Sequence, residues 1–173
     1  MRFTPALVAA AAMLAATGAA NAQSAEPPTG PWAMMLSVPY DPGSQPVVAW
    51  VSEDNIIGPP ENEEEYINEH WEMMLHQPAS IDPDPDRWTL RRMRYVCGDS
   101  TVSVRETHTY QGDALVETTG PEAPSDIMPH TLAAFTINVV CRTGIAEAAP
   151  RAAGRAAAIS EQAAFLERWN TPR

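Results

Sequence analysis

The 173-residue sequence contains no lysine, and all eleven of its strong bases are arginines. Against them stand 22 aspartates and glutamates, so the formal net charge is −11. The arginines do not gather into a basic segment, and so acidic a chain repels phosphate backbones. We therefore expect no nucleic acid among its partners.

The familiar catalytic and metal-binding patterns are also missing. There is no G-x-S-x-G, no glycine-rich phosphate loop, no C-x-x-C and no H-E-x-x-H. The acidic stretch 82–86 does not match a calcium loop, because the sixth and twelfth positions counted from Asp82 are Arg87 and Met93 instead of Gly and Glu. We expect no catalytic residue, no cofactor and no metal ligand, and we do not expect an enzyme.

Other potential ligands are explained more simply by structural roles. Structural or surface roles are favoured over a metal site for the four histidines, which lack ligand spacing: His70, His76, His108 and His130. The methionine pairs at 34–35 and 73–74 are typical of core packing, with copper binding as the alternative.

The N-terminus has the pattern of a secretory signal peptide. Arg2 precedes the apolar stretch 6–16, and Ala20-Asn21-Ala22 forms an A-x-A cleavage site. The apolar stretch is too short to span a bilayer, no later stretch is apolar enough, and no cysteine near the cleavage site could carry a lipid. We predict cleavage after Ala22 and a periplasmic or secreted mature chain. Loss of Arg2 would change its net charge from −11 to −12.

Cys97 and Cys141 are the only cysteines. Two cysteines in an exported chain are expected to pair, because the compartment is oxidising. The chain-entropy model gives the resulting loop a stabilising effect of about 4 kcal/mol. The alternatives are two buried thiols or, less favoured, a metal pair. A metal pair is disfavoured because no further Cys or His lies at ligand spacing around either cysteine.

Several segments have the composition of strands. The pattern predicts strands over 32–38, 47–51, 88–97, 101–110 and 114–119, with a hairpin turn at 111–113 in which Gly112 can adopt a positive φ. In the third of these strands, one alternating set of side chains is the more apolar and is expected to face the core: Arg91, Met93, Tyr95 and Cys97.

Two segments fit either a helix or a strand. Residues 61–77 have an acidic first turn that favours a helix, but their apolar residues also alternate at period two. Residues 129–140 begin with Pro129, which suits a first helical turn, and end in β-branched residues, which suit a strand.

The alanine-rich tail, residues 143–173, is expected to contain a helix over 156–169. Its proposed apolar side consists of Ile159, Ala163, Leu166 and Trp169. The helix could dock on the protein's own sheet, dock on a partner or remain a mobile tail.

From Trp32 to Arg142 the chain resembles the surface-adhesin protein E family of exported bacterial proteins. The matching features are Tyr95-Val96-Cys97 at the end of a strand, the central hairpin, a proline-containing loop with Ser125, an apolar stretch ending at Cys141, and the order of the upstream tryptophans. The resemblance implies an α+β fold, in which a small antiparallel sheet and one packed helix are joined by the Cys97–Cys141 disulfide. It also implies a helix after Pro129 and a strand within 61–77.

The resulting hypothesis divides the chain into a signal peptide (1–22), a protein E-like domain (23–142) and a C-terminal helical tail (143–173). Family members with an assigned role bind host matrix and plasma proteins at the cell surface. We therefore expect a non-enzymatic binding protein of the envelope or surface, whose protein partner the sequence does not name. The alternative is a periplasmic carrier of a small ligand or metal.

Overall fold

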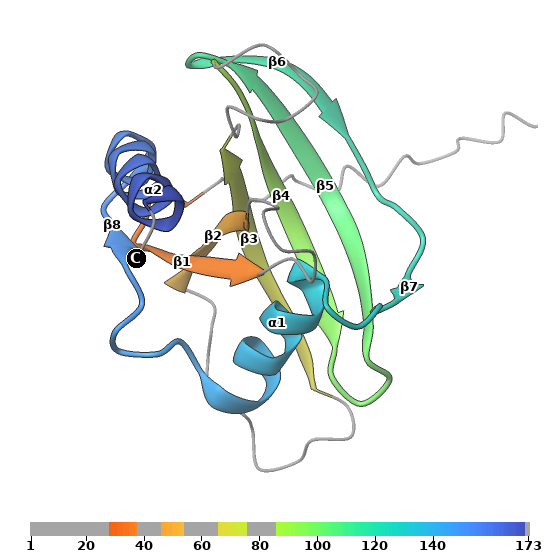
Figure 1. Ribbon diagram of the computed structural model, residues 1–173. Helices are drawn as coiled ribbons and strands as arrows, with labels where there is room; N and C mark the ends of the chain where they lie inside the picture. The colour runs from red at the N-terminus through yellow and green to blue at the C-terminus, as the bar shows by residue number, and fades with distance from the viewer. Residues whose placement is uncertain (1–27, 38–45, 54–65, 76–85, 172–173) are drawn as a thin grey trace, which may run out of the picture.

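The computed structural model describes residues 28–37, 46–53, 66–75 and 86–171. Within them the chain forms an eight-stranded antiparallel sheet and two α-helices, which confirms the expected α+β fold with one disulfide and an additional C-terminal helix (Figure 1). The strands are β1 (Trp32–Ser37), β2 (Val47–Ser52), β3 (Ile67–Leu75), β4 (Arg87–Val96), β5 (Thr101–Gln111), β6 (Ala114–Thr119), β7 (Ser125–Asp126) and β8 (Arg151–Ala152). The helices are α1 (Leu132–Asn138), which continues as the π-helical turn η3 (Val139–Thr143), and α2 (Arg155–Asn170).

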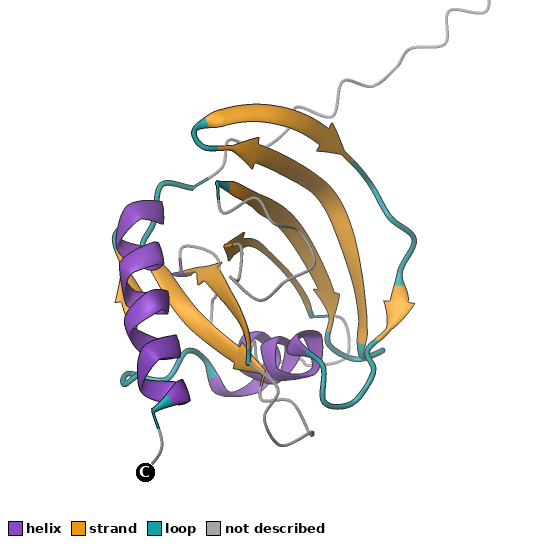
Figure 2. Ribbon diagram, turned by 45° about the horizontal axis from the view of Figure 1, so that its top comes forward, coloured by secondary structure: helices purple, strands orange, loops and turns teal. Residues whose placement is uncertain are grey.

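The sheet follows the order β6-β5-β4-β3-β2-β1-β8, and β7 pairs with the far end of β5. Successive strands from β1 to β6 are neighbours, as in a meander of hairpins. The long strands curve across the molecule, and α2 lies near the end of the sheet that contains β1 and β8 (Figure 2). No described helix is long and apolar enough to cross a membrane.

The ambiguous stretch 61–77 contains a strand where the structure describes it. β3 pairs with β4 over nine consecutive positions, from Ile67–Val96 to Leu75–Trp88, and with β2 on its other side. Pairing with β4 along its whole length and with β2 at Glu72 and Met73 satisfies backbone groups of β3, so the described part of the stretch is a strand. Residues 61–65 and 76–77 lie outside the described part of the chain.

Both faces of the sheet are covered, each by a different helix. On the α2 face, Trp50, Trp71 and Met73 pack in one cluster with Ala158 of α2. On the opposite α1 face, Tyr95 packs against Val140 of η3. This double coverage explains why strands such as β1 and β2 are apolar almost throughout instead of alternating.

The coverage also corrects the predicted inward face of residues 88–97. Met93 and Tyr95 are buried as expected, but Leu90, from the opposite set, is buried too and belongs to the α2-face cluster. Arg91 of the predicted inward set remains partly exposed and pairs with Glu72. Alternation cannot separate inside from outside in a strand whose two faces both pack against helices.

After Pro129 the chain forms a helix, the alternative that the resemblance implied. Thr131 is its N-cap, and its Oγ1 accepts a hydrogen bond from the Ala134 amide at 3.2 Å. The helix therefore begins at Leu132, three positions after Pro129, which does not occupy the first turn as expected. The β-branched residues at its end form η3, where Val140 and Cys141 are buried.

α2 matches the predicted helix closely in length, but its buried side shares only Leu166 with the predicted apolar side. Ala158, Gln162 and Leu166 are buried, whereas Ile159 and Trp169 of the predicted apolar side are 46% and 42% exposed. The Trp50 indole N–H donates to Gln162 Oε1 at 3.1 Å, so a polar side chain lies at the centre of the contact. The helix docks on the protein's own sheet, one of the three arrangements considered from the sequence.

Candidate binding sites

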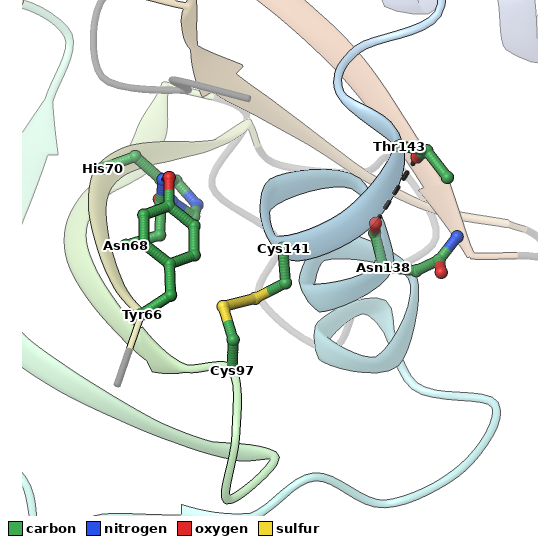
Figure 3. Close-up of a disulfide and its surroundings, with 7 residues drawn as sticks. All are labelled: Tyr66, Asn68, His70, Cys97, Asn138, Cys141 and Thr143. Carbon is green, nitrogen blue, oxygen red and sulfur yellow. Dashed lines mark hydrogen bonds between the residues drawn. A yellow bond between two sulfur atoms is a disulfide. The ribbon is translucent and has the colours of Figure 1, made fainter. Parts of the chain in front are cut away.

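Cys97 and Cys141 form a disulfide, with their Cα atoms 5.7 Å apart. The bond joins the turn after β4 to η3 and so attaches the helical segment to the α1 face of the sheet (Figure 3). The predicted pairing is therefore present, and the alternatives of free thiols and a metal pair do not apply to this structure.

A groove of about 420 Å³ lies beside the disulfide, between α1–η3 and the segments that follow β4 and β7. Ile127, Phe135 and Ile137 form its apolar part, and Phe135 is 42% exposed. Ser100, Asn138 and Arg142 supply its polar groups. The volume falls within the range of about 300–1,000 Å³ that is usual for small-molecule sites.

Arg142 gives the groove its charge. Among the described residues, its guanidinium forms no ion pair and no side-chain hydrogen bond, and the side chain is exposed. Asp99 and Asp126 are neighbours in the chain of the lining residues Ser100 and Ile127, but neither lines the groove. Sequence reasoning missed this site, because its residues come from segments that only the disulfide and the fold bring together.

A second group of polar side chains is buried beneath the α1 face. Glu72 is 1% exposed, and its Oε1 lies 3.3 Å from His70 Nε2 and accepts a hydrogen bond from the Tyr95 hydroxyl at 3.0 Å. Its Oε2 accepts from Arg91 Nη2 at 3.1 Å. The His70 ring stacks on Tyr95 with centroids 5.3 Å apart, and Asn68 Oδ1 lies 2.8 Å from His70 Nδ1.

These contacts determine the charge states in the cluster. Burial tends to raise the pKa of Glu72, but the hydrogen bond and charge of His70, the charge of Arg91 and the Tyr95 hydrogen bond together lower it below the ordinary value. Burial, and then the neighbouring Glu72 charge, raise the pKa of Tyr95, which stays a protonated donor. Each of these side chains contacts a protein neighbour, although the buried Nε of Arg91 has no hydrogen-bond partner among the described residues. The cluster is a structural network that holds β3 to β4.

The signal for this network was present in the sequence but ambiguous. Asn68, His70 and Glu72 lie on one side of β3, and the residues on the other side are apolar except for Glu69. A polar side of this kind usually faces solvent. Here that side is covered by α1 and η3, and the polar groups satisfy one another. His70 has the structural role that was favoured for it over metal binding.

A more exposed ionic ladder lies on the α2 face. Arg92 Nη2 donates to Glu69 Oε2 at 2.8 Å, and its Nη1 lies 3.7 Å from Glu106 Oε1. Glu106 Oε2 in turn lies 3.2 Å from His108 Nε2. Arg94 Nε also lies 3.9 Å from Glu69 Oε1. Two arginines thus balance the two glutamates, and the ladder offers no strongly charged surface to a ligand.

Among the described residues, no group of three or more His, Cys, Asp or Glu side chains could hold a metal ion. His76 and the acidic stretch from 82 to 85 lie outside these residues. His130 is exposed and adopts a φ of 63°. Met34, Met35 and Met73 are buried in core clusters, the role that was favoured for them over copper binding.

The outer edge of the sheet is the most exposed strand surface. All six residues of β6 are exposed, including Leu115 at 52% and Val116 at 58%. β6 pairs with β5 on one side and is the terminal strand of the sheet, at the opposite end from β8 (Figure 1). Its register with β5 shifts between Thr109 and Tyr110, so Val116 has no directly opposed partner.

The hairpin turn agrees with the prediction from the sequence. Gln111 pairs with Ala114, and Gly112 has the expected positive φ, at 58°. Beyond β6 the same edge continues past Gly120, where an added Cβ would lie 2.9 Å from the Arg105 carbonyl oxygen. The Glu122 amide donates to the Val104 carbonyl, which holds this segment along β5 up to β7.

Comparison with protein-family models, with curated proteins and with solved structures finds no match to this chain.

Proposed function

We propose that the mature chain is a non-enzymatic, exported binding protein of the cell envelope or surface that binds an extended, positively charged segment of a partner protein along β6. The observation that carries this proposal is the terminal strand itself, with its six exposed residues. An edge strand has unpaired backbone donors and acceptors, and strand addition is a common way of recognising extended peptides.

The side chains of β6 also favour this use. Natural edges are often blocked by proline, lysine or inward-pointing charge. The six residues ALVETT contain no proline and no lysine, and their one charged residue, Glu117, is exposed. Prolines occur only farther along the edge, at 121 and 124. The exposed Leu115 and Val116 would give a bound segment apolar contacts in addition to backbone hydrogen bonds.

The charge of the edge argues for a basic partner. Four carboxylates lie along it, and no lysine or arginine occurs between Arg105 and Arg142: the four are Asp113, Glu117, Glu122 and Asp126. Arg155 neutralises Asp113 at 3.0 Å, which leaves three carboxylates without an ion pair among the described residues. Such an edge attracts cationic segments and repels acidic ones.

A pair of eight-residue peptides, one alternating Lys and Val and the other alternating Glu and Val, tests the proposal. We expect the Lys/Val peptide to bind the mature protein and to slow amide hydrogen exchange within residues 114–119. The Glu/Val peptide should do neither, because its apolar content is equal and only its charge differs. Binding should weaken as salt is raised.

The double substitution Leu115→Lys, Val116→Lys should abolish binding and leave the melting temperature almost unchanged, because both side chains are already exposed. Ile159→Lys is the matched control, since Ile159 is 46% exposed on α2. Equal binding of the two peptides, or protection confined to residues outside β6, would contradict the proposal.

We also propose kinship with the surface-adhesin protein E family. The antiparallel sheet, the helix after Pro129 and the Cys97–Cys141 bond support it. The tail goes beyond what the resemblance implies, since β8 pairs with β1 and α2 packs on the same sheet. The disulfide also supports an extracellular or periplasmic location, because disulfides persist in oxidising compartments.

The alternative function, a periplasmic carrier of a small ligand, is favoured by one observation, the groove beside the disulfide. Metal transport has no comparable support within the described residues. The peptide experiment separates the two functions, because occupation of the groove would leave exchange in β6 unchanged.

A further inference from the structure

The groove beside the disulfide combines an apolar wall with one unpaired cation. Ile127 and Ile137 pack towards the α1-face core, and Phe135 extends the wall towards solvent. Arg142 contributes a guanidinium that forms no ion pair with any described residue. Asn138 and Ser100 add groups that can form hydrogen bonds.

Arg142, like Arg105 and Arg168, forms no ion pair with a described residue, and of these three arginines it is the one that lines the groove. Acidic residues outnumber basic ones by 22 to 11, and on the sheet Arg91, Arg92 and Arg94 all lie within 4.0 Å of a carboxylate. Arg142 is therefore available to a ligand anion, with which a guanidinium forms strong charge-assisted hydrogen bonds.

We propose that this groove binds a small amphipathic carboxylate, with its apolar chain against Phe135, Ile127 and Ile137 and its carboxylate on Arg142. The volume of about 420 Å³ suits a small molecule, whose buried surface would be mainly apolar. The carboxylate would exclude uncharged and cationic molecules of the same shape. This site is independent of β6, so either proposal can fail without the other.

The disulfide supplies a reporter of occupancy, because Cys97 and Cys141 both line the groove. A bound molecule should shield the sulfur atoms from an added dithiol. The experiment measures the rate at which dithiothreitol reduces the disulfide of the mature protein, with decanoate, decanol or decylamine present below its micelle concentration. Decanoate should slow reduction several-fold in a saturable manner, and its dissociation constant should agree with that from calorimetry.

Decanol and decylamine test the charge assignment with the same apolar chain. Both should bind at least about tenfold more weakly than decanoate, as expected when a hydrogen bond to a charged group is lost. Stronger binding of decylamine would show that Asp99 and Asp126 determine the charge preference, and would overturn the proposal.

Arg142→Gln should raise the decanoate dissociation constant about tenfold or more, and Phe135→Ala should raise it by a smaller factor. Arg168→Gln in the last turn of α2 removes the same charge at a distance from the groove and should change nothing. Reduction rates are compared as the ratio with and without decanoate for each variant, since Arg142 can itself alter the approach of the dithiol. An unchanged ratio in Arg142→Gln, or no slowing of reduction by decanoate in the unmodified protein, would overturn the proposal.

Discussion

Glu72 retains a negative charge in the interior because its neighbours replace the water it has lost. Two donors, Tyr95 and Arg91, reach different carboxylate oxygens, and His70 lies against the first. The carboxylate would be very costly to bury alone, and removing one partner of such a group leaves the others unsatisfied.

This arrangement gives a defined pH dependence. The folded-state pKa of Glu72 is lowered, so its contribution to stability is fully present above the unfolded value of about 4.3 and is lost as the pH falls through the lower folded value. The cluster therefore stabilises the protein at neutral pH and weakens only in acid.

Glu72→Gln should lower the free energy of unfolding by about 2–3 kcal/mol at pH 7, because the neutral amide leaves Arg91, His70 and Tyr95 poorly paired. Urea unfolding from pH 7 to pH 3 measures the difference from the unmodified protein. The difference should shrink below about pH 4.3, where Glu72 becomes protonated in the unfolded state, and should vanish once the pH is below the lower folded-state pKa.

Glu69→Gln is the control on the same strand. Glu69 pairs with Arg92, but both side chains are 31% exposed, so its loss should cost at most about 1 kcal/mol. If the two substitutions lower the free energy of unfolding equally at pH 7, the buried ion pair of Glu72 contributes no more than the exposed pair of Glu69, and the prediction is wrong.

At the level of elements, the sequence pattern predicted the position of the C-terminal helix α2 but not its buried side. Alanine content predicted α2 to within a residue or so at each end, because propensity is a local property. Of the predicted apolar side only Leu166 is buried, because the buried side is centred on Gln162, a polar residue that an apolar pattern leaves out. Only the Trp50 indole, which is distant in sequence, explains why a polar residue belongs there.

Leu166→Ala should therefore destabilise the protein by about 2–3 kcal/mol, since the side chain is 9% exposed and its loss leaves a cavity beneath α2. Ile159→Ala, on the side that the sequence had predicted to be buried, should cost less than about 1 kcal/mol. Leu166 belongs to both the predicted and the observed buried side, so Ile159 is the position that distinguishes them. Chemical denaturation of both variants measures the two effects, and an effect at Ile159 as large as that at Leu166 would contradict the observed orientation.

At the level of the whole molecule, the positions of β1, β2, β4, β5 and β6 and the disulfide could be predicted, because they depend on local patterns and on the only two cysteines. The α+β class and the strand within 61–77 followed from the resemblance, and β7 and β8 were not predicted. The groove, the Glu72 network and the outer edge could not be predicted. Arg142 and Ile127 become neighbours only when α1 is tied to the sheet, and β6 is an edge only because no later strand joins it. Such sites are products of topology.

Export of the chain and formation of the Cys97–Cys141 disulfide can be tested in one experiment. If residues 1–22 direct export, the chain recovered from a bacterial periplasm should begin at Gln23 and contain no free thiol, since that compartment is oxidising. A version without residues 1–22, retained in the cytoplasm, should contain both thiols. N-terminal sequencing and mass spectrometry without reductant measure both properties.

The two forms should also differ in stability. Closing the loop between Cys97 and Cys141, which are 44 positions apart, should stabilise the exported form by about 4 kcal/mol in the chain-entropy model. This is a large share of the 5–15 kcal/mol typical of a folded domain. Cys97→Ala, Cys141→Ala is the control, because that variant should be equally stable from either compartment. Free thiols in the exported chain, or a stability difference that persists in the variant, would contradict a disulfide formed on export as the bond that attaches α1 and η3 to the sheet.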